Sequence, residues 1–445
     1  MTEIKRPDNI SEKPYPPSGY GWFLVAMLTL AYVLSYIDRS ILGLLIEPIK
    51  ADLSLTDEQI GLIFGPAFAI LYATMGIPIG WLVDRARRTW IVSAGLIVWS
   101  AATAISGLAT SFWQLFFARM TVGIGEASLS PSAMSIIGDS FPPEKRGKPI
   151  AVYTAALSMG GGIAYLIGGA VLDWAKSSSS IDVPLVGSLA PWQATFFAVG
   201  LPGILVGLFF VFMRDPERRE VTSEDVGLAG NSLMDAARYV GNNFAVIGGV
   251  LSLVCVMTII AYSQAFLPAT FTRTWGWPAE KYAYINGIGL LVFGPVTVIV
   301  TGILSDKFSQ KGMVDASFRL MILGFLMMVS TSIISMFVPK PEIAYAILCV
   351  NIMGMGIMSA MGITSLLRIT PPQIRGQIVA LYYMVISLAG LFLGPTIVGV
   401  LSTRVFGEEN IRFAMATLPI VFGLIPFLLI PYIHKRYLVQ AQKFS

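Results

Sequence analysis

Four charged residues lie deep inside long apolar stretches of the sequence: Asp38, Arg39, Arg119 and Glu126. A charge near the centre of a membrane-spanning helix costs roughly 2.5–3.5 kcal/mol, so we expect these side chains to face a cavity or one another. They form a neutral set, and protonating either acid would leave an arginine unpaired. Breaking one partner of a buried ion pair costs roughly 3–5 kcal/mol, which is enough to shift a conformational equilibrium. The chemistry that these residues could do is therefore reversible proton binding.

The spacing of the four residues brings them to matching depths. Arg119, Gly123 and Glu126 follow helical spacing and share one face of a helix. Asp38 and Arg39 lie about seven residues before the end of their apolar stretch, and Arg119 lies about seven residues after the start of its own. We predict that Asp38 is the main proton-binding group, that Glu126 is its partner or a substrate-sensing acid, and that the arginines hold both. The alternative is an inert ion-pair cluster that only locks two helices together.

The composition indicates what surrounds these charges. Of the 445 residues, 55% are apolar and 13% are charged, and the mean hydropathy is +0.72, whereas soluble domains carry roughly 25% charged residues. So few charges cannot cover a soluble surface, and most of the outer surface must face lipid. We expect a multi-pass integral membrane protein of the inner or plasma membrane. The net charge of +4 is too small to suggest a nucleic-acid partner.

The apolar stretches predict an all-α fold with twelve membrane-spanning helices in two six-helix bundles. The expected parts are an N-terminal tail (1–19), a first bundle (20–213), a linker (214–242) with an amphipathic helix at 232–240, a second bundle (243–433) and a C-terminal tail (434–445). The spans are expected at about 20–45, 58–83, 89–109, 112–139, 148–172, 191–213, 243–271, 281–305, 316–338, 342–368, 376–402 and 412–433. Lysine and arginine are about three times as frequent in the segments on one side, which predicts that both termini are cytoplasmic.

Two short motifs recur at the same relative places in each half. Pro142-Pro143-Glu144-Lys145-Arg146-Gly147 is matched by Pro371-Pro372-Gln373-Ile374-Arg375-Gly376, and Gly80-Trp81-Leu82-Val83-Asp84-Arg85 is matched by Gly302-Ile303-Leu304-Ser305-Asp306-Lys307. The chain is therefore expected to be a duplicated six-helix unit with two pseudo-symmetric bundles. Such duplications commonly place a binding site between the halves, near the middle of the bilayer.

With these motifs, the sequence resembles the major facilitator superfamily over essentially its whole length. Arg119-Met120-Thr121-Val122-Gly123-Ile124-Gly125 is similar to that superfamily's Arg-x-x-x-Gly-x-Gly motif. Ser35-Tyr36-Ile37-Asp38-Arg39, together with Glu126, narrows the resemblance to the Spinster-like branch. The resemblance implies a monomeric secondary active transporter that works by alternating access through a rocker-switch motion. It also implies a proton as the coupling ion, with Asp38, Arg39, Arg119 and Glu126 in that role.

The same resemblance implies a cytoplasmic gate. In the superfamily, the acid at the position of Asp84 pairs across the boundary between the halves and caps a helix of the other half. Such a pair must break before the halves can separate on that side. The predicted gate residues are Gly80, Asp84, Arg85 and Arg88, with Asp306 and Lys307 as the weaker second copy. Arg87 stands where the superfamily often has glycine, and positive-inside anchoring is the alternative role for Arg87 and Arg88.

The span interiors favour an amphipathic substrate. Only Gln264, Asn286 and Asn351 are deep amides, whereas sugar carriers need several amides and hydroxyls to replace the water around a sugar. The predicted cavity residues are Tyr36, Phe68, Gln264, Asn286 and Asn351. Taken with the Spinster-like resemblance, this predicts a lysolipid or a sphingoid lipid as the substrate. The alternatives are a proton-coupled organic-anion or sugar-acid transporter of the same superfamily, or a channel.

Other classes of protein are excluded by what the sequence lacks. An ATP-driven pump would need Gly-x-x-x-x-Gly-Lys-Ser/Thr, but Gly147-Lys148 is followed by Pro149. A membrane-embedded enzyme would need a nucleophile with a base or a metal cluster, but the interiors of the predicted spans contain no histidine and only two acids. We therefore expect no enzymatic activity and no cofactor or metal. His434, the single histidine, is expected to lie at the membrane interface.

Overall fold

The computed structural model describes residues 14–177, 181–183, 187–218, 237–371 and 374–443, and most of them are helical. The N-terminal half contains α1 (Ser18–Leu44), α2 (Ile46–Leu53), α3 (Asp57–Phe64), α4 (Pro66–Val83), α5 (Arg88–Ser106), α6 (Phe112–Glu126), α7 (Leu129–Ser140), η1 (Pro143–Lys145), α8 (Gly147–Lys176) and α9 (Pro191–Phe212). The C-terminal half contains α11 (Phe244–Ser263), η2 (Gln264–Phe266), α12 (Leu267–Trp275), α13 (Ala279–Gln310), α14 (Ala316–Ile334), α15 (Pro341–Arg368), α16 (Arg375–Ser387), η4 (Leu388–Leu393), α17 (Gly394–Leu401), η5 (Ser402–Phe406), η6 (Glu408–Asn410) and α18 (Ile411–Ala441). A short hairpin of β1 (Ile181–Val183) and β2 (Gly187–Leu189) joins α8 to α9.

Eleven helical runs within the described residues are long and apolar enough to cross a membrane. The predicted fourth span is the exception, because it is divided into α6 and α7 at Ala127 and Ser128. Pro131 explains the division, since it has no N–H to donate to the carbonyl of Ala127. The N–H of Ser128 bonds instead to the carbonyl of Gly125, three residues back, at 3.2 Å. The all-α membrane fold is confirmed, with the fourth span built from two shorter helices.

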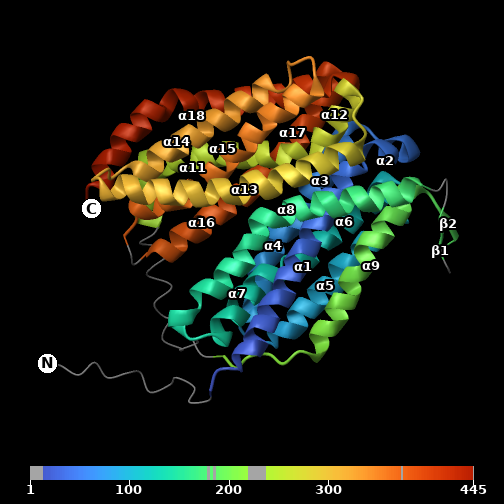
Figure 1. Cartoon of the computed structure of the whole chain (residues 1–445), viewed down its shortest axis with the longest axis horizontal. Helices are drawn as coiled ribbons and strands as arrows, with labels where there is room; N and C mark the ends of the chain where they lie inside the picture. Colours follow the sequence, from blue (N-terminus) through green and yellow to red (C-terminus); the bar gives the residue numbers. More distant parts are fainter. Residues whose placement is uncertain (1–13, 178–180, 184–186, 219–236, 372–373, 444–445) are drawn as a thin grey trace.

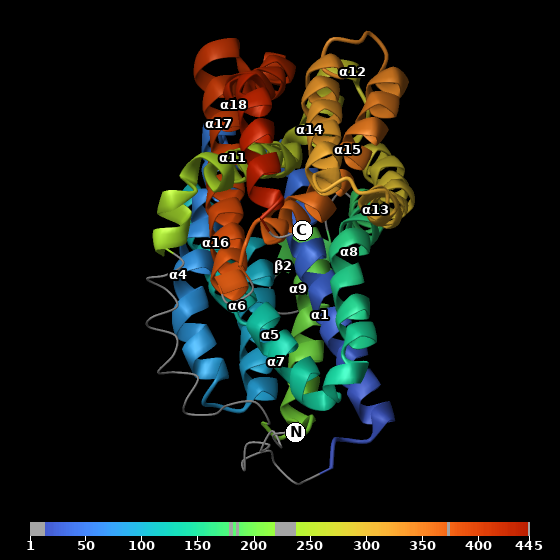
Figure 2. The ribbon, with the colours of Figure 1, turned by 90° about the vertical axis from the view of Figure 1, so that its left-hand side faces the viewer.

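The helices form two bundles that meet along a seam, shown in Figure 1 and, turned by 90°, in Figure 2. In the N-terminal half α5 packs against α9 and α6, and α1 packs against α8; in the C-terminal half α14 packs against α15, and α11 against α18. Buried apolar side chains fill each bundle, such as Leu96 and Trp99 in the first and Phe318 and Phe325 in the second. The most extensive contacts across the seam join α8 to α13 and α3 to α17.

Glycines let the helix backbones touch across this seam. A Cβ at Gly61 would lie 2.6 Å from the carbonyl oxygen of Pro395, and a Cβ at Gly162 would lie 2.8 Å from the carbonyl oxygen of Gly287. Neither position has room for a side chain. Such close crossings of small residues are a common way to pack helices in membranes, where the hydrophobic effect does not drive one helix onto another.

The arginines of the two Pro-Pro-x-x-Arg-Gly motifs do the same job in each half. Arg146 Nε donates to the carbonyl of Phe141 at 2.9 Å, and Arg375 Nε donates to the carbonyl of Thr370 at 3.3 Å. In both copies the acceptor lies five residues earlier, just past the end of the preceding helix. The shared contact fits an internal duplication. Pro372 and Gln373 of the second motif lie outside the described residues.

The two ends of the linker are attached to different halves. Arg218 donates to the carbonyls of Val83 and Ala86 at 2.5 and 2.6 Å, while the Tyr239 hydroxyl donates to the carbonyl of Ile369 and accepts from Gln440 Nε2 at 2.9 Å. Residues 232–236 of the expected amphipathic helix lie outside the described residues, whereas residues 237–242 are helical. At the C-terminus, α18 continues to Ala441, so the expected tail from residue 434 is mostly an extension of the last helix.

Candidate functional site

Glu126 and Arg39 form an ion pair between α6 and α1. Arg39 donates to Glu126 Oε2 through Nε at 2.8 Å and through Nη2 at 2.5 Å. Ser35, one turn earlier on α1, donates its hydroxyl to the same oxygen at 2.7 Å. Charge-assisted bonds of this kind are the strongest hydrogen bonds in proteins. The Glu126 side chain is 1% exposed and that of Arg39 is 26% exposed, so the pair can be reached only from the arginine side.

Asp38 and Arg119 lie beside this pair but are bonded differently from the prediction. Asp38 is buried and accepts a hydrogen bond from Thr103 of α5 at 3.2 Å. Arg119 is also buried and lies within electrostatic reach of both acids, yet its Nε and Nη1 have no hydrogen-bond partner among the described residues. The arginines therefore do not hold the two acids alike, because Arg39 is bonded to Glu126 alone. A buried guanidinium with unused donors is costly and leaves bonding capacity for water or a shifted carboxylate.

Aromatic rings surround the exposed side of Arg39. Its Cζ lies 4.7 Å from the ring centre of Phe68 and 5.5 Å from that of Tyr72, both on α4, which is a favourable distance for cation–π contact. Tyr36 packs edge-on against Tyr32 with ring centres 5.4 Å apart. Tyr262 of α11 also lies within electrostatic reach of Arg39, so the C-terminal half contributes to this wall. Phe68 is 2% exposed, so its ring packs against the guanidinium and does not line open space.

The predicted cavity amides fall into two groups. Asn351 is fully buried between α15 and α14, where it donates to the carbonyl of Met328 at 2.8 Å and to the hydroxyl of Ser332 at 2.7 Å. It also accepts from Gln264 Nε2 at 2.7 Å. These bonds use its polar atoms inside the C-terminal half, so placing Asn351 in a substrate cavity was wrong for this conformation. Asn286, on α13, is 8% exposed, and its role stays a prediction.

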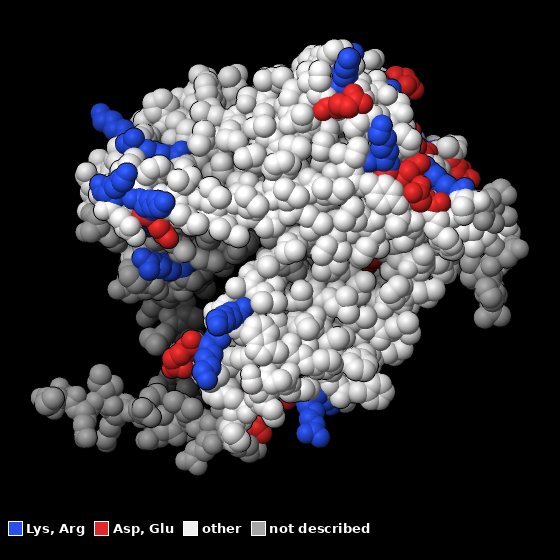
Figure 3. All heavy atoms as spheres, in the orientation of Figure 1, with Lys and Arg blue, Asp and Glu red and all other residues white. Residues whose placement is uncertain are grey.

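The two halves are joined at one end of the seam by an ion-pair network, which we call the Asp57 latch. It comprises Glu47, Lys50 and Asp57 of the N-terminal half with Arg273, Ser402 and Glu408 of the C-terminal half. Asp57 is fully buried and accepts from Arg273 Nη1 at 2.6 Å, from Lys50 Nζ at 2.5 Å and from Ser402 Oγ at 2.6 Å. Figure 3 shows acidic and basic side chains gathered at this closed end, on its right-hand side.

The Asp57 latch was not predicted from the sequence. Its members are far apart in the chain, and none belongs to a motif that the sequence analysis singled out. A signal was nevertheless present, because acids cluster at the start of the second span, where Asp57 is followed by Glu58, and basic residues stand at the ends of other spans on the same predicted side. Glu58 is paired with Arg404 of the other half at 2.5 Å, which extends the closed end outward.

At the opposite end, which carries the predicted gate residues, the halves are apart. Figure 3 shows the surface hollowed between them on the left-hand side. The Asp84 side chain is exposed, and among the described residues no bond joins it to the C-terminal half. Arg85 packs over the ring of Trp81 at 4.4 Å, a Cβ at Gly80 would meet no atom within 4 Å, and Asp306 and Lys307 are exposed. A gate at this open end is not formed in this conformation, so its residues stay a prediction.

Arg88 is the exception among the predicted gate residues, because it is fully buried inside the N-terminal half. Its guanidinium contacts Asp139 at the end of α7, lies 2.9 Å from Asp215 Oδ1 at the start of the linker, and donates to the Ser135 hydroxyl at 2.9 Å. Its backbone N–H donates to Asp215 Oδ2 at 2.6 Å. All of these partners lie in the N-terminal half or the start of the linker. Arg88 therefore ties the loop region of that half together and, in this conformation, does not bridge the seam.

Comparison with known proteins gives relatives of three kinds. An MFS-type efflux pump of Mycolicibacterium smegmatis is 28% identical over 86% of this chain and 84% of that protein. A probable L-galactonate transporter of Escherichia coli is 23% identical over 70% of each chain. A sphingosine-1-phosphate transporter of Danio rerio is 34% identical over a shorter stretch, which covers 33% of this chain and 29% of that protein.

Solved structures give the same answer for the whole chain. The crystal structure of a bacterial homologue of the human lysosomal transporter Spinster, in an inward-facing and unoccupied conformation, matches with a TM-score of 0.78 and 25% identity, over 96% of this chain and 98% of that one. The family model for the Major Facilitator Superfamily matches residues 28–395. The chain therefore belongs to the Major Facilitator Superfamily, within which it is a Spinster-like membrane transporter and not an enzyme.

Proposed function

We propose that this transporter works by alternating access and that protons bound at Asp38 and Glu126 drive the change between its conformations. The observation that carries the proposal is the unequal bonding of the charge cluster. Glu126 is held by Arg39, whereas among the described residues Asp38 has only a hydroxyl partner and Arg119 keeps unused donors. A carboxyl bonded to Thr103 alone loses little when it is protonated. Once it is deprotonated, Asp38 would be attracted to Arg119, which gives the cluster two arrangements that differ by one proton.

Glu126 has a second role in the proposal. If Glu126 took up a proton, Arg39 would lose its charged partner while remaining in contact with Phe68 and Tyr72. Its guanidinium would then be available to an anionic group on a substrate. Reciprocally, a bound anion would compete with Glu126 for Arg39 and favour protonation of the acid. Substrate binding and proton binding are thereby linked, as coupled transport requires.

The orientation predicted from the basic residues makes the Asp57 latch external and the open end cytoplasmic. We infer that the structure is the inward-facing conformation, with both termini in the cytoplasm. The outward-facing conformation would require the latch to break and the open end to close. The predicted gate residues Asp84 and Asp306 would then meet the opposite half, which is the state in which their role can be tested.

For the substrate, we propose an amphipathic anion such as a lysolipid or a phosphorylated sphingoid lipid. Arg39 supplies one positive charge, and the rings of Tyr32, Tyr36 and Tyr72 supply an apolar wall with polar tips. The half-buried amide of Gln264 and the buried amide of Asn351 are bonded to each other, so little hydrogen-bonding capacity is left in the C-terminal half for a sugar. The similarity to a sphingosine-1-phosphate transporter supports the same class.

A sugar acid or another organic anion is the second candidate. The similarity to a probable L-galactonate transporter covers more of the chain than the lipid-transporter match does. A carboxylate would also pair with the exposed guanidinium of Arg39. The two candidates differ in the apolar tail, which only the lipid would place against the tyrosines.

The test is uptake by purified protein in liposomes, with and without a pH gradient, of a labelled lysophospholipid, sphingosine 1-phosphate and galactonate. We expect gradient-dependent uptake of a lipid, and we expect Asp38→Asn to abolish the dependence on the gradient. Glu342→Gln, at an exposed acid on the first turn of α15, is the matched control and should behave like the unaltered protein. Unchanged gradient dependence in Asp38→Asn would overturn the coupling mechanism, and preference for galactonate would select the second candidate.

A further inference from the structure

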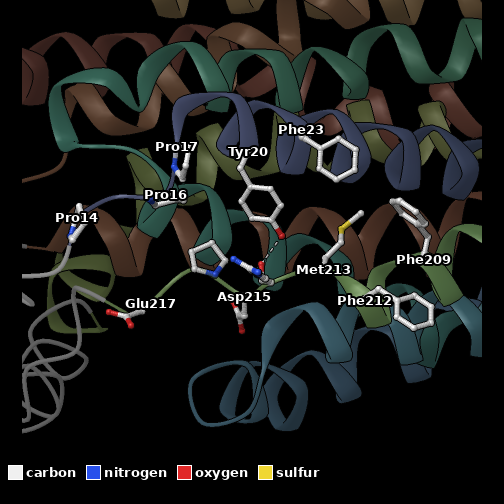
Figure 4. A pocket seen from close by; sticks show the side chains of 12 residues that line it. Pro14, Pro16, Pro17, Tyr20, Phe23, Phe209, Phe212, Met213, Asp215 and Glu217 are labelled. Atoms are coloured by element: carbon white, nitrogen blue, oxygen red, sulfur yellow. Dashed lines mark hydrogen bonds between the residues drawn. The ribbon is translucent and has the colours of Figure 1, made fainter.

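A cavity of about 680 Å³ lies on the N-terminal half at the open end, away from the charge cluster. Its walls come from residues 14–17, the first turns of α1, the last turn of α9 and the start of the linker (Figure 4). Its volume is within the range of sites that bind small molecules. None of the proposed coupling or substrate residues lines it, so it is separate from the transport pathway.

One side of this cavity is apolar and strongly exposed. Phe212 is 82% exposed, Phe209 50% and Phe23 40%. The rings of Phe23 and Phe209 pack edge-on with centres 6.2 Å apart, and they bridge α1 and α9. Both helices are long and apolar enough to cross a membrane, so we expect these rings to contact acyl chains or the region just below the headgroups.

The other side of the cavity is polar and built from the linker. The hydroxyl of Tyr20 donates to the carbonyl of Arg214 at 2.8 Å, which fixes the start of the linker beside the first turn of α1 (Figure 4). Asp215 is paired with Arg88 at 2.9 Å, so its carboxylate is directed toward α5 and its charge is partly compensated. The Arg214 side chain is exposed, and within the described residues no bond to it is seen. Glu217 is exposed as well, and Figure 4 places it at the opposite end of the cavity from Phe209 and Phe212.

We propose that this cavity binds a phospholipid of the surrounding bilayer, with its phosphate on Arg214 and an acyl chain on Phe23, Phe209 and Phe212. The order of the groups matches a lipid in the membrane, because the exposed rings belong to the spans and the arginine follows the end of α9. Basic residues at this position beside membrane helices commonly attract lipid headgroups. The site is also distinct in its surroundings from the central one, since Arg39 lies between helices and is 26% exposed, whereas Arg214 is exposed beyond the end of α9.

Native mass spectrometry of the delipidated protein in detergent tests the proposal directly. The probes are phosphatidylglycerol and phosphatidylethanolamine with identical chains, and the matching diacylglycerol, which has no phosphate. We expect one tightly bound molecule of either phospholipid, and diacylglycerol binding at least tenfold weaker. Arg214→Gln should weaken phospholipid binding about tenfold, and Phe212→Ser should weaken all three probes.

The matched control is Lys311→Gln, an exposed basic residue at the open end of the other half, which should retain the lipid. Equal binding of diacylglycerol and phospholipid, or equal retention by Arg214→Gln and the unaltered protein, would overturn the proposal. Arg214 and Phe212 are both exposed, so neither substitution should prevent folding, and the melting temperature of each variant checks this. Because the measurement needs no transport, its outcome is independent of the proposed substrate and coupling.

Discussion

The two ends of the seam use their charged residues in opposite ways. At the closed end, acids and bases from different halves bond to one another, with Asp57 at the centre. At the open end, Arg88 and Arg218 bond to atoms of the N-terminal half and the linker, and Arg368 bonds to the carbonyl of Val314 in its own half. Charges at the closed end therefore stabilise one conformation, whereas charges at the open end stabilise each bundle. The difference can be measured. Charges at the closed end should control the distance between the halves, whereas charges at the open end should affect only the melting temperature.

The largest effect on the distance between the halves is expected from Asp57→Asn. The change leaves Lys50 and Arg273 without their shared carboxylate in a buried place, and breaking such a pair costs roughly 3–5 kcal/mol. The closed end should therefore open in a large fraction of molecules. Spin labels can be placed at the exposed positions Ala51 and Glu409, one on each half. Double electron–electron resonance spectroscopy would then report the opening as a longer distance between the labels. An unchanged distance distribution would show that the latch does not set the conformation.

Arg88→Gln is expected to have a comparable cost of about 3–5 kcal/mol but a different result, since it leaves Asp139 and Asp215 without their buried partner. Thermal unfolding should begin at a lower temperature, while the spin-label distance at the closed end should stay the same. Lys145→Gln, at an exposed basic position between α7 and α8, is the control and should change neither. A changed distance in Arg88→Gln would restore Arg88 to the predicted gate.

A smaller shift is expected from Gly61→Val, where the added Cβ would lie 2.6 Å from the carbonyl oxygen of Pro395. Overpacking of this kind costs about 1–3 kcal/mol, and here the halves can relieve it by moving apart. The closed-end distance should broaden toward longer values. Gly302→Val, where a Cβ meets no atom within 4 Å, is the matched control. If both variants behave alike, contact between backbones is not what holds the seam.

The smallest effect is expected at Asp315, the residue before α14. Its carboxylate bonds to His434 on α18 and to Arg319 in the first turns of α14. Burial raises the pKa of Asp315, but hydrogen bonds from His434 at 2.6 Å and Arg319 at 2.7 Å lower it further, so the net pKa lies below the ordinary value. A carboxyl with a lowered pKa stabilises the folded state above about pH 4 and loses this contribution as the pH falls through its folded pKa.

Asp315→Asn should therefore lower the melting temperature by a few degrees at pH 7 and progressively less as the pH falls below about 4. The control at each pH is Glu342→Gln, an exposed acid on α15. The closed-end distance should not change, because the partners of Asp315 lie in its own half. An effect that persists unchanged at low pH would mean that packing, not charge, accounts for the loss.

The sequence predicted most of the helices because the membrane requires long apolar runs, and such runs can be read without knowing any contacts. It did not predict the break at Ala127 and Ser128, although Pro131 was a local signal for it. The gathering of Asp38, Arg39, Arg119 and Glu126 followed from their depth. Which arginine pairs with which acid did not, because it depends on rotations of α1 against α6 that spacing alone leaves open.

The outcomes for Asn351 and the Asp57 latch have one cause. A deep amide can face a cavity or satisfy a neighbouring helix, and the choice depends on the hydroxyls of Thr331 and Ser332 opposite Asn351. The latch depends on bringing together residues that are hundreds of positions apart in the chain. Both are properties of pairing between helices, which one sequence does not reveal.

Arg88 and Arg218 fasten the start of the linker to α5 and to the end of α4, and Tyr20 fastens it to α1, so the linker wall of the outer cavity is held to the N-terminal half. If the halves rock as proposed, wall and rim must travel as one piece, and the cavity keeps its shape throughout the cycle. A molecule bound there would move with the N-terminal half throughout the transport cycle, and it would not itself be transported across the bilayer.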